Sequence, residues 1–171
     1  MTTGTSTART TGTAAARRQL VTFEAAGELF AADIFAVERV LRYVTPRLLP
    51  NAAPWLRGVL AHGGMTIPLV DLRERLGLEL VPPTETSRIL VVAVGETRIG
   101  VTVDAVLAVR TVDAAAFEPP PAIYRGLAKE YLEGVVRQGG DIFVVLATDR
   151  LLTSTERIEM ARVIEAGAGN G

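Results

Sequence analysis

The chain has 171 residues, of which 49% are hydrophobic and 22% are charged, and its formal net charge is −1. This balance excludes an intrinsically disordered chain and a nucleic-acid binder that relies on bulk positive charge, and the length allows one compact domain or two very small ones. Cysteine is absent and His62 is the only histidine. Disulfides, zinc–thiolate sites, iron–sulfur clusters and cysteine nucleophiles are therefore excluded, and too few ligands remain for a multi-histidine metal site.

Both ends of the chain have the composition of disordered tails. Residues 1–18 carry three arginines, no acidic residue and no large apolar residue after Met1, so they bury too little surface to offset the entropy lost on ordering. A transit peptide has a similar composition, but this segment lacks an amphipathic helical stripe. Residues 166–171 contain only Ala, Gly and Asn and predict a frayed end. The longest apolar run, residues 89–94, is too short to cross a membrane, and no secretory signal is visible, so we expect a soluble, cytoplasmic protein.

Between the tails the sequence predicts mostly β-structure. Four pairs of apolar, β-branched segments flank short turns that contain glycine, which is typical of β-hairpins. The expected turns lie at residues 25–27, 62–64, 95–97 and 138–140. Two further strands are expected at residues 37–43 and 106–112, short helical turns at 33–37 and 71–76, and a linker at 82–87. An amphipathic helix is expected at residues 153–165, because residues 153–156, with the sequence Thr-Ser-Thr-Glu, offer N-terminal caps ahead of spaced apolar residues.

The hairpins recur in a fixed order, which indicates an internal repeat. Residues 58–64 align with residues 134–140, and a further strand follows each segment. A looser match relates residues 21–40 to residues 91–109, since both contain an apolar strand, a Gly-Glu turn, a second apolar strand, an Asp and two valines three apart. Hairpins with glycine turns also resemble one another by chance, but the shared order favours a duplication. Each copy has about five strands in roughly 65 residues, which suits a small closed barrel, and two such barrels should pack together.

Candidate catalytic groups are few. His62 stands beside two glycines in an expected hairpin turn, without a nucleophile motif or a phosphate-binding loop, so an exposed turn histidine explains it best. The aspartates at element boundaries are better explained as caps or loop-closing residues than as a two-carboxylate or metal site. Arginines occur in pairs, such as Arg39 with Arg42, rather than in patches, which argues against nucleic-acid binding. Many apolar residues must lie at the surface or between the barrels, and this predicts an adaptor rather than an enzyme, without metal or cofactor.

Several motifs, taken in order, resemble the CheW-type coupling proteins of bacterial chemosensory arrays. They lie between about Gln19 and Leu152, at residues 30–37, 45–46, 49–60, 67–73, 99–106 and 119–121. No single motif is decisive, but their order and spacing together are specific. The resemblance implies an all-β fold of two intertwined five-stranded SH3-like barrels with short helices and a C-terminal helix. The domain would span residues 19–152, with the first barrel at about 19–83, the second at about 84–147, and exchange of strands between them left open.

The resemblance also implies a non-catalytic scaffold in the cytoplasm, associated with membrane-bound receptor arrays. Its partners would be the regulatory domain of a CheA-type histidine kinase and the cytoplasmic tip of a methyl-accepting chemoreceptor, without nucleic acid and without direct insertion into the membrane. The positions that it carries over as receptor- or kinase-binding are Ile34, Val37, Arg39, Val40, Gly58, Gly63, Gly100 and Val106.

Two of these positions depart from the pattern that the family usually shows. The family usually has Glu where this chain has Arg39, and Arg where this chain has Gly63. A frequent opposite-charge pair is thus changed at both members, which predicts an altered choice of partner. Two alternatives stay open: a coupling protein of a non-flagellar pathway, such as gliding or type IV pilus motility, and a tandem-barrel peptide-binding regulator without a kinase partner.

Overall fold

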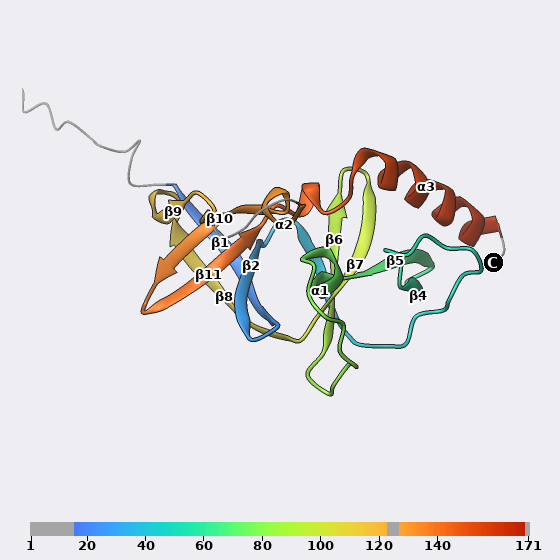
Figure 1. Ribbon diagram of the computed structural model, residues 1–171, viewed down its shortest axis with the longest axis horizontal. Coiled ribbons are helices and arrows are strands. Elements are labelled where there is room, and N and C mark those ends of the chain that lie inside the picture. Colours follow the sequence, from blue (N-terminus) through green and yellow to red (C-terminus); the bar gives the residue numbers. More distant parts are fainter. Residues whose placement is uncertain (1–15, 123–126, 170–171) are drawn as a thin grey trace, which may run out of the picture.

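The computed structural model describes residues 16–122 and 127–169, which form two curled β-sheets (Figure 1). Sheet A has six strands in the order β8-β1-β2-β11-β10-β9, and sheet B has five in the order β3-β6-β7-β5-β4. The strands of sheet A are β1 (Arg17–Ala25), β2 (Glu28–Asp33), β8 (Ala105–Asp113), β9 (Phe117–Glu118), β10 (Leu132–Gln138) and β11 (Asp141–Leu146). Those of sheet B are β3 (Val37–Arg42), β4 (Gly58–His62), β5 (Met65–Asp71), β6 (Arg88–Val94) and β7 (Thr97–Val103).

The two sheets share one plan. In each, a central hairpin, β1–β2 or β6–β7, has an antiparallel strand on one side and one strand of a second hairpin on the other. The second hairpin joins in parallel, with Val144 opposite Phe30 in sheet A and Leu69 opposite Gly100 in sheet B. The hairpins that turn at residues 62–64 and 138–140 therefore occupy equivalent places, as the repeat predicts.

Each sheet takes strands from both copies of the repeat. The chain leaves sheet A after β2, forms all of sheet B from β3 to β7, and then returns to sheet A with β8. The expected division into barrels at residues 19–83 and 84–147 therefore does not describe the sheets, because the third strand and the second hairpin of each copy join the central hairpin of the other copy. Sheet A also has one strand more than the expected five, since the two-residue β9 adds to β10.

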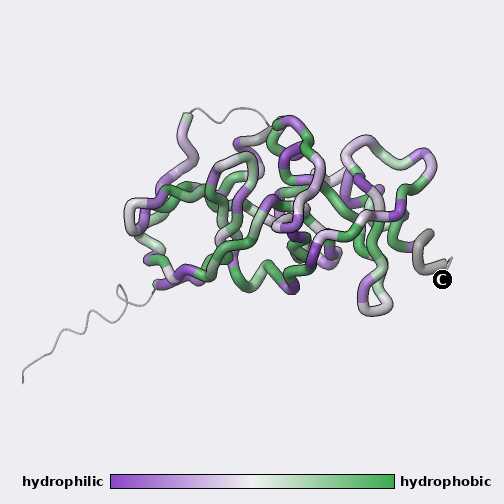
Figure 2. The backbone as a smooth tube through the Cα atoms, turned by 90° about the horizontal axis from the view of Figure 1, so that it is seen from below, coloured by the Kyte–Doolittle hydropathy of each residue, from purple (hydrophilic) through white to green (hydrophobic). Residues whose placement is uncertain are grey.

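The largest hydrophobic core draws side chains from both sheets. Phe23 and Phe30 of sheet A meet Val92 and Val101 of sheet B in this shared core, and a smaller core around Phe143 lies within sheet A. Figure 2 shows long hydrophobic stretches of the chain separated by short hydrophilic ones. Because a fully buried large apolar side chain stabilises the fold by roughly 1.5–3 kcal/mol, the shared core holds the two sheets together.

Short helices follow some of the strands. Helix α1 (Leu72–Arg75) begins directly after β5, where Asp71 caps it by accepting a hydrogen bond from the Arg73 N–H at 2.8 Å, which agrees with the helical turn expected at residues 71–76. The turn expected to be helical at 33–37 is instead a short hydrogen-bonded turn, in which the Ala36 N–H donates to the Asp33 carbonyl. The other short helices are η1 (Ala114–Ala116), α2 (Leu127–Glu130) and η2 (Thr148–Arg150).

The C-terminal helix α3 (Ser154–Gly169) packs against β5 of sheet B (Figure 1). A capping box stands at its start, within the residues expected to cap it, since the Thr153 N–H donates to Glu156 Oε1 at 2.9 Å and the Glu156 N–H donates to Thr153 Oγ1 at 3.2 Å. Glu156 also accepts a hydrogen bond from Arg75 at 2.7 Å, and Met160 is fully buried. Burial opposes ionisation of Glu156, but the hydrogen bonds from Arg75 and Thr153 lower its pKa overall. The helix continues past residue 165, into the segment expected to be frayed.

The expected N-terminal tail overlaps β1, so its boundary at residue 18 is wrong. Arg18 forms ion pairs with Asp33 at 3.0 Å and with Glu133, and these partners, which lie on other segments of the fold, explain why a polar residue extends the strand. Residues 1–15 and 170–171 lie outside the described residues. None of the helices that the structure describes is long and apolar enough to cross a membrane.

Candidate interaction surface

Five of the positions that the resemblance predicts as receptor- or kinase-binding are not glycines. They lie on or next to β3 and β8, the two crossing strands, each of which begins where the chain passes from one sheet to the other. Ile34 and Val37 are half-buried where the chain enters β3, Arg39 and Val40 are exposed on β3, and Val106 is half-buried at the start of β8. Val37 and Val106 both pack against the core shared by the two sheets. The structure thus places residues that are far apart in sequence against one apolar core.

A β-bulge in each crossing strand decides which side chains face the shared core. In the pairing of β3 with β6, and of β1 with β8, the register shifts by one residue. The extra residue puts Val40 on the same side of β3 as Val37, and Val109 on the same side of β8 as Val106. Val40 and Val109 are 45% and 53% exposed, so each crossing strand has an exposed valine next to the shared core.

Two of the predicted glycines are packing positions rather than contact surface. Gly58 and Gly100 are buried. A Cβ atom at Gly58 would lie 2.6 Å from the Arg47 carbonyl oxygen, and a Cβ atom at Gly100 would lie 2.8 Å from Leu69 Cδ1. Atoms do not approach so closely without a shift, so a side chain at either position would disturb the packing of sheet B. Such a change would affect the binding of a partner only through that disturbance.

Gly63 lies exposed at the tip of the β4–β5 hairpin. Its φ is +58° and that of Gly64 is +77°, the left-handed pair that a type I′ turn requires and that glycine adopts without strain. A Cβ atom at Gly63 would meet no other atom within 4 Å. Because β3 and β4 are the two outermost strands in the order of sheet B, strand pairing does not bring Gly63 next to Arg39.

Three arginines on and after β3 have no partner among the described residues. Arg39, Arg42 and Arg47 are exposed, and their side chains form no hydrogen bond or ion pair within residues 16–122 and 127–169. The nearest acid in sequence, Glu38, is paired with Arg98. We call these three residues the arginine strip. The sequence shows the spacing of Arg39 and Arg42 but misses Arg47, because its lack of a carboxylate partner is a property of the fold.

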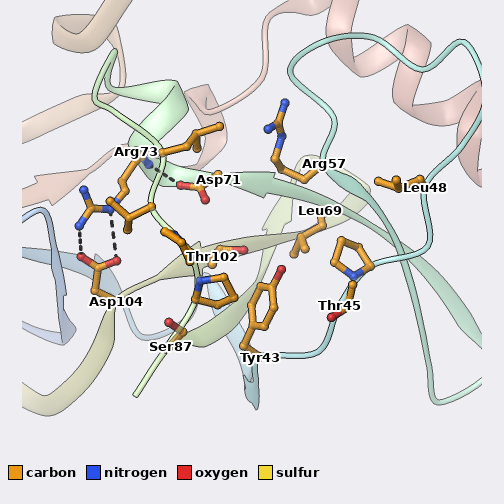
Figure 3. A pocket seen from close by; sticks show the side chains of 15 residues that line it. Tyr43, Thr45, Leu48, Arg57, Leu69, Asp71, Arg73, Ser87, Thr102 and Asp104 are labelled. Atoms are coloured by element: carbon orange, nitrogen blue, oxygen red, sulfur yellow. Dashed lines mark hydrogen bonds and ion pairs between the residues drawn. The ribbon is translucent and has the colours of Figure 1, made fainter. Parts of the chain in front are cut away.

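A pocket of about 380 Å³ lies beside the arginine strip. Tyr43 and Leu48, from the segment after β3, line one part of it, and Arg73 and Asp104 line the other (Figure 3). Residues 80–83, which overlap the start of the linker expected at residues 82–87, also contribute to its wall. The sequence does not predict this pocket, since its walls come from segments that only the fold brings together.

The Asp104 carboxylate stabilises the point between β7 and β8 at which the chain passes from sheet B to sheet A. It accepts hydrogen bonds from Arg73 Nη2 at 2.7 Å and from the Ala26 N–H at 2.9 Å, and so joins α1 to the β1–β2 turn. Burial opposes ionisation of Asp104, but these hydrogen bonds and the charge of Arg73 lower its pKa overall. Burial has the larger effect on the neighbouring Asp71 and raises its pKa. No group of His, Asp or Glu side chains in the described part of the chain is arranged to hold a metal ion.

The sequence matches the model of the CheW-like domain over residues 19–156. The chain belongs to the CheW-like family. The chemotaxis protein CheW of Treponema pallidum is 28% identical over 149 residues, which cover 85% of this chain and 88% of that protein. The CheW of Rhizobium meliloti is 29% identical over 140 residues, covering 82% of this chain and 90% of that protein.

A solved structure has the same fold. The crystal structure of the scaffolding protein TtCheW from Thermoanaerobacter tengcongensis matches with a TM-score of 0.74 and 28% identity, covering 81% of this CheW-like chain and 96% of that chain. This similarity confirms the all-β, SH3-like fold that the resemblance implies.

Proposed function

We propose that this CheW-like protein is a non-catalytic adaptor that couples chemoreceptors to a CheA-type histidine kinase. The observation that carries the proposal is the match to the CheW-like domain over residues 19–156, and the similarity to a scaffolding protein over 96% of that protein's chain supports it. An adaptor acts by holding its partners in place, so its activity depends on exposed surfaces rather than on a catalytic group.

The proposed contact surface follows the two crossing strands. Its members are Ile34, Val37, Arg39, Val40 and Val106, with Gly63 reaching a partner from the hairpin tip and with Gly58 and Gly100 supporting sheet B from inside. The shared core beneath Val37 and Val106 keeps the surface rigid, and a preorganised surface loses less entropy on binding. The partners would be the kinase regulatory domain and the receptor tip, which places the protein in the cytoplasm at receptor arrays.

Calorimetry with the kinase regulatory domain and with a cytoplasmic receptor fragment, both from the same organism, tests the proposal. We expect micromolar dissociation constants, about −8 kcal/mol, as for a small and reversible contact. Absence of heat and of co-sedimentation with either partner at high micromolar concentration would contradict the adaptor function.

A matched pair of variants tests the surface separately. Val40→Ser should weaken binding, because Val40 lies on the proposed surface, whereas Ile142→Ser should not, because Ile142 lies on β11 of sheet A with a similar exposure of 52%. Equal affinity of both variants would contradict the surface and leave the adaptor function standing.

A further inference from the structure

We infer that the arginine strip and the pocket beside it bind an acidic segment of a protein partner. The carboxylates of that segment contact the arginines, and one of its apolar side chains enters the pocket. The inference rests on the proposed adaptor function, because the segment would belong to one of the adaptor's partners. It adds the chemistry by which this particular chain recognises that partner.

The first observation is a local excess of positive charge. Apart from the strip, the described cationic side chains without a hydrogen bond or ion pair are Lys129 on α2 and Arg162 on α3. Three unpaired arginines thus lie within residues 39–47, in a chain whose net charge is −1. No carboxylate approaches from β6 either: Arg42 lies opposite Arg88, which donates to the backbone carbonyls of residues 85 and 87. The strip therefore keeps a positive potential that an acidic surface would neutralise.

The second observation is apolar surface interleaved with these charges. Val40, Val44 and Leu48 are 45%, 47% and 77% exposed, and Leu48 leads into the pocket of about 380 Å³. β3 is the outermost strand of sheet B and pairs only with β6 in the described chain. By the register of this pairing Arg39 lies on the opposite face of β3 from Val40 and Arg42, and all three side chains are exposed. A pocket near the small end of the range for ligand sites suits a single apolar side chain.

A protein segment fits these features better than a nucleic acid or a membrane. Single-stranded nucleic acid is held by several aromatic side chains along a basic groove, whereas the exposed residues between the arginines are Val40, Val44 and Thr45, and the single aromatic residue there, Tyr43, is half-buried. Binding to an anionic membrane grows with the number of basic residues, and this strip has three in a chain of slightly negative net charge. Alternating carboxylates and an apolar anchor match both the charges and the pocket.

The test uses the full chain and a fluorescein-labelled peptide of alternating glutamates and leucines as the probe. Fluorescence anisotropy should show binding that weakens as salt is raised, and the triple variant Arg39→Gln/Arg42→Gln/Arg47→Gln should bind at least about tenfold more weakly. Arg162→Gln is the matched control, since it removes an equally unpaired and exposed arginine from α3, and it should bind like the wild type. Equal binding by the wild type and the triple variant would overturn the inference.

The pocket is tested by a second pair of measurements. Leu48→Ser should weaken binding of the glutamate–leucine peptide by about threefold or more, because Leu48 lines the pocket. The same variant should not change the weaker binding of a peptide in which serine replaces leucine. An equal effect on both peptides would show that the pocket holds no apolar anchor and would overturn that part of the inference.

Further arms separate this inference from its alternatives. Binding to phosphatidylglycerol vesicles or to a DNA duplex that needs the three arginines, without binding of the peptide, would overturn it in favour of another anionic partner. Kinase or receptor fragments that bind the wild type and the triple variant equally would also overturn it, with the adaptor function intact. Peptide binding without any kinase or receptor binding would support the acidic site and contradict the adaptor function. The melting temperature of the triple variant should be unchanged, and Arg39→Gln alone serves if the triple variant fails to fold.

Discussion

β3 and β8 are equivalent strands of the two copies of the repeat, and they differ in whether an arginine on the strand has a partner side chain. Each crosses to the other sheet, contains a bulge and packs a valine against the shared core. On β8, Arg110 binds Asp141 at 2.6 Å and lies 5.5 Å from the centre of the Phe143 ring. On β3, Arg42 has no partner among the described residues. Arg110 on β8 thus stabilises the fold, whereas Arg42 on β3 is available for a partner.

The segments that close the two sheets repeat this contrast. Arg47 bridges to Val59 in sheet B, and Glu118 pairs with Val135 in the equivalent place of sheet A. Glu118 forms an ion pair with Arg137 at 3.4 Å, whereas Arg47 has no ion pair within the described chain. Sheet B is therefore the sheet with unneutralised charge at its edge.

The largest expected effect tests whether the segments that close the two sheets, at Arg47 and at Glu118, are structurally equivalent. A Cβ atom would lie 2.6 Å from the Arg47 carbonyl oxygen at Gly58, and 2.5 Å from the Glu118 carbonyl oxygen at Gly134. Gly58 also has φ +139°. We expect Gly58→Ala to lower the free energy of unfolding by about 3 kcal/mol and Gly134→Ala by about 2 kcal/mol, measured by urea denaturation. Wild-type stability in only one of the two variants would break the equivalence.

The passage of the chain from sheet B into β8 is stabilised by Asp104. Asp104→Asn should lower the free energy of unfolding by about 1–2 kcal/mol at pH 7, because it weakens the part-exposed pair with Arg73. The folded state lowers the pKa of Asp104, so its stabilisation is present above the pKa of the unfolded chain and is lost as pH falls through the folded-state pKa. The difference between wild type and variant should therefore shrink below about pH 4. Denaturation curves at pH 7 and at pH 3 check this, and a difference that stays constant would contradict it.

The hairpin tips offer a matched comparison between the sheets. Gly63 and Gly139 both have φ +58°, and a Cβ atom at either would meet nothing within 4 Å. Gly63→Arg and Gly139→Arg should each lower the free energy of unfolding by roughly 1 kcal/mol through backbone strain alone. If Gly63 belongs to the contact surface, only Gly63→Arg should also change the affinity for the kinase or receptor fragment. Equal affinities in calorimetry would remove Gly63 from the surface.

The residue pattern predicts the hairpins, whereas the intertwining of the barrels is implied only by the family resemblance, which leaves the exchange of strands open. Strand alternation and glycine turns are local signals, so the turns at residues 62–64 and 138–140 are readable before the fold is known. Which hairpin a crossing strand pairs with is a non-local choice, and the repeat by itself allows either. Arg18 shows the same limit, since it joins β1 through carboxylates on other segments. Arg39 enters the candidate surface by resemblance, whereas Arg47 becomes a candidate only when the fold shows that no described carboxylate reaches it.

The smallest expected effect isolates the contrast between β3 and β8. Arg110→Gln should lower the free energy of unfolding by about 0.5–1 kcal/mol, because it removes a part-exposed ion pair and a contact with an aromatic ring, and should leave partner binding unchanged. Arg42→Gln should leave stability unchanged and weaken partner binding by about two- to fivefold. Thermal melts and calorimetry on both variants measure the four quantities.

Salt adds a further distinction between these two arginines. Screening shortens the reach of exposed charges to about 3 Å at 1 M salt, so the affinity difference between wild type and Arg42→Gln should nearly vanish there. Part of the stability loss in Arg110→Gln should persist at 1 M salt, because the guanidinium also packs against the ring of the buried Phe143. If Arg42→Gln instead destabilises the fold, or Arg110→Gln instead weakens binding, the two strands have not divided these roles, and the free charge on β3 has a structural use inside the protein.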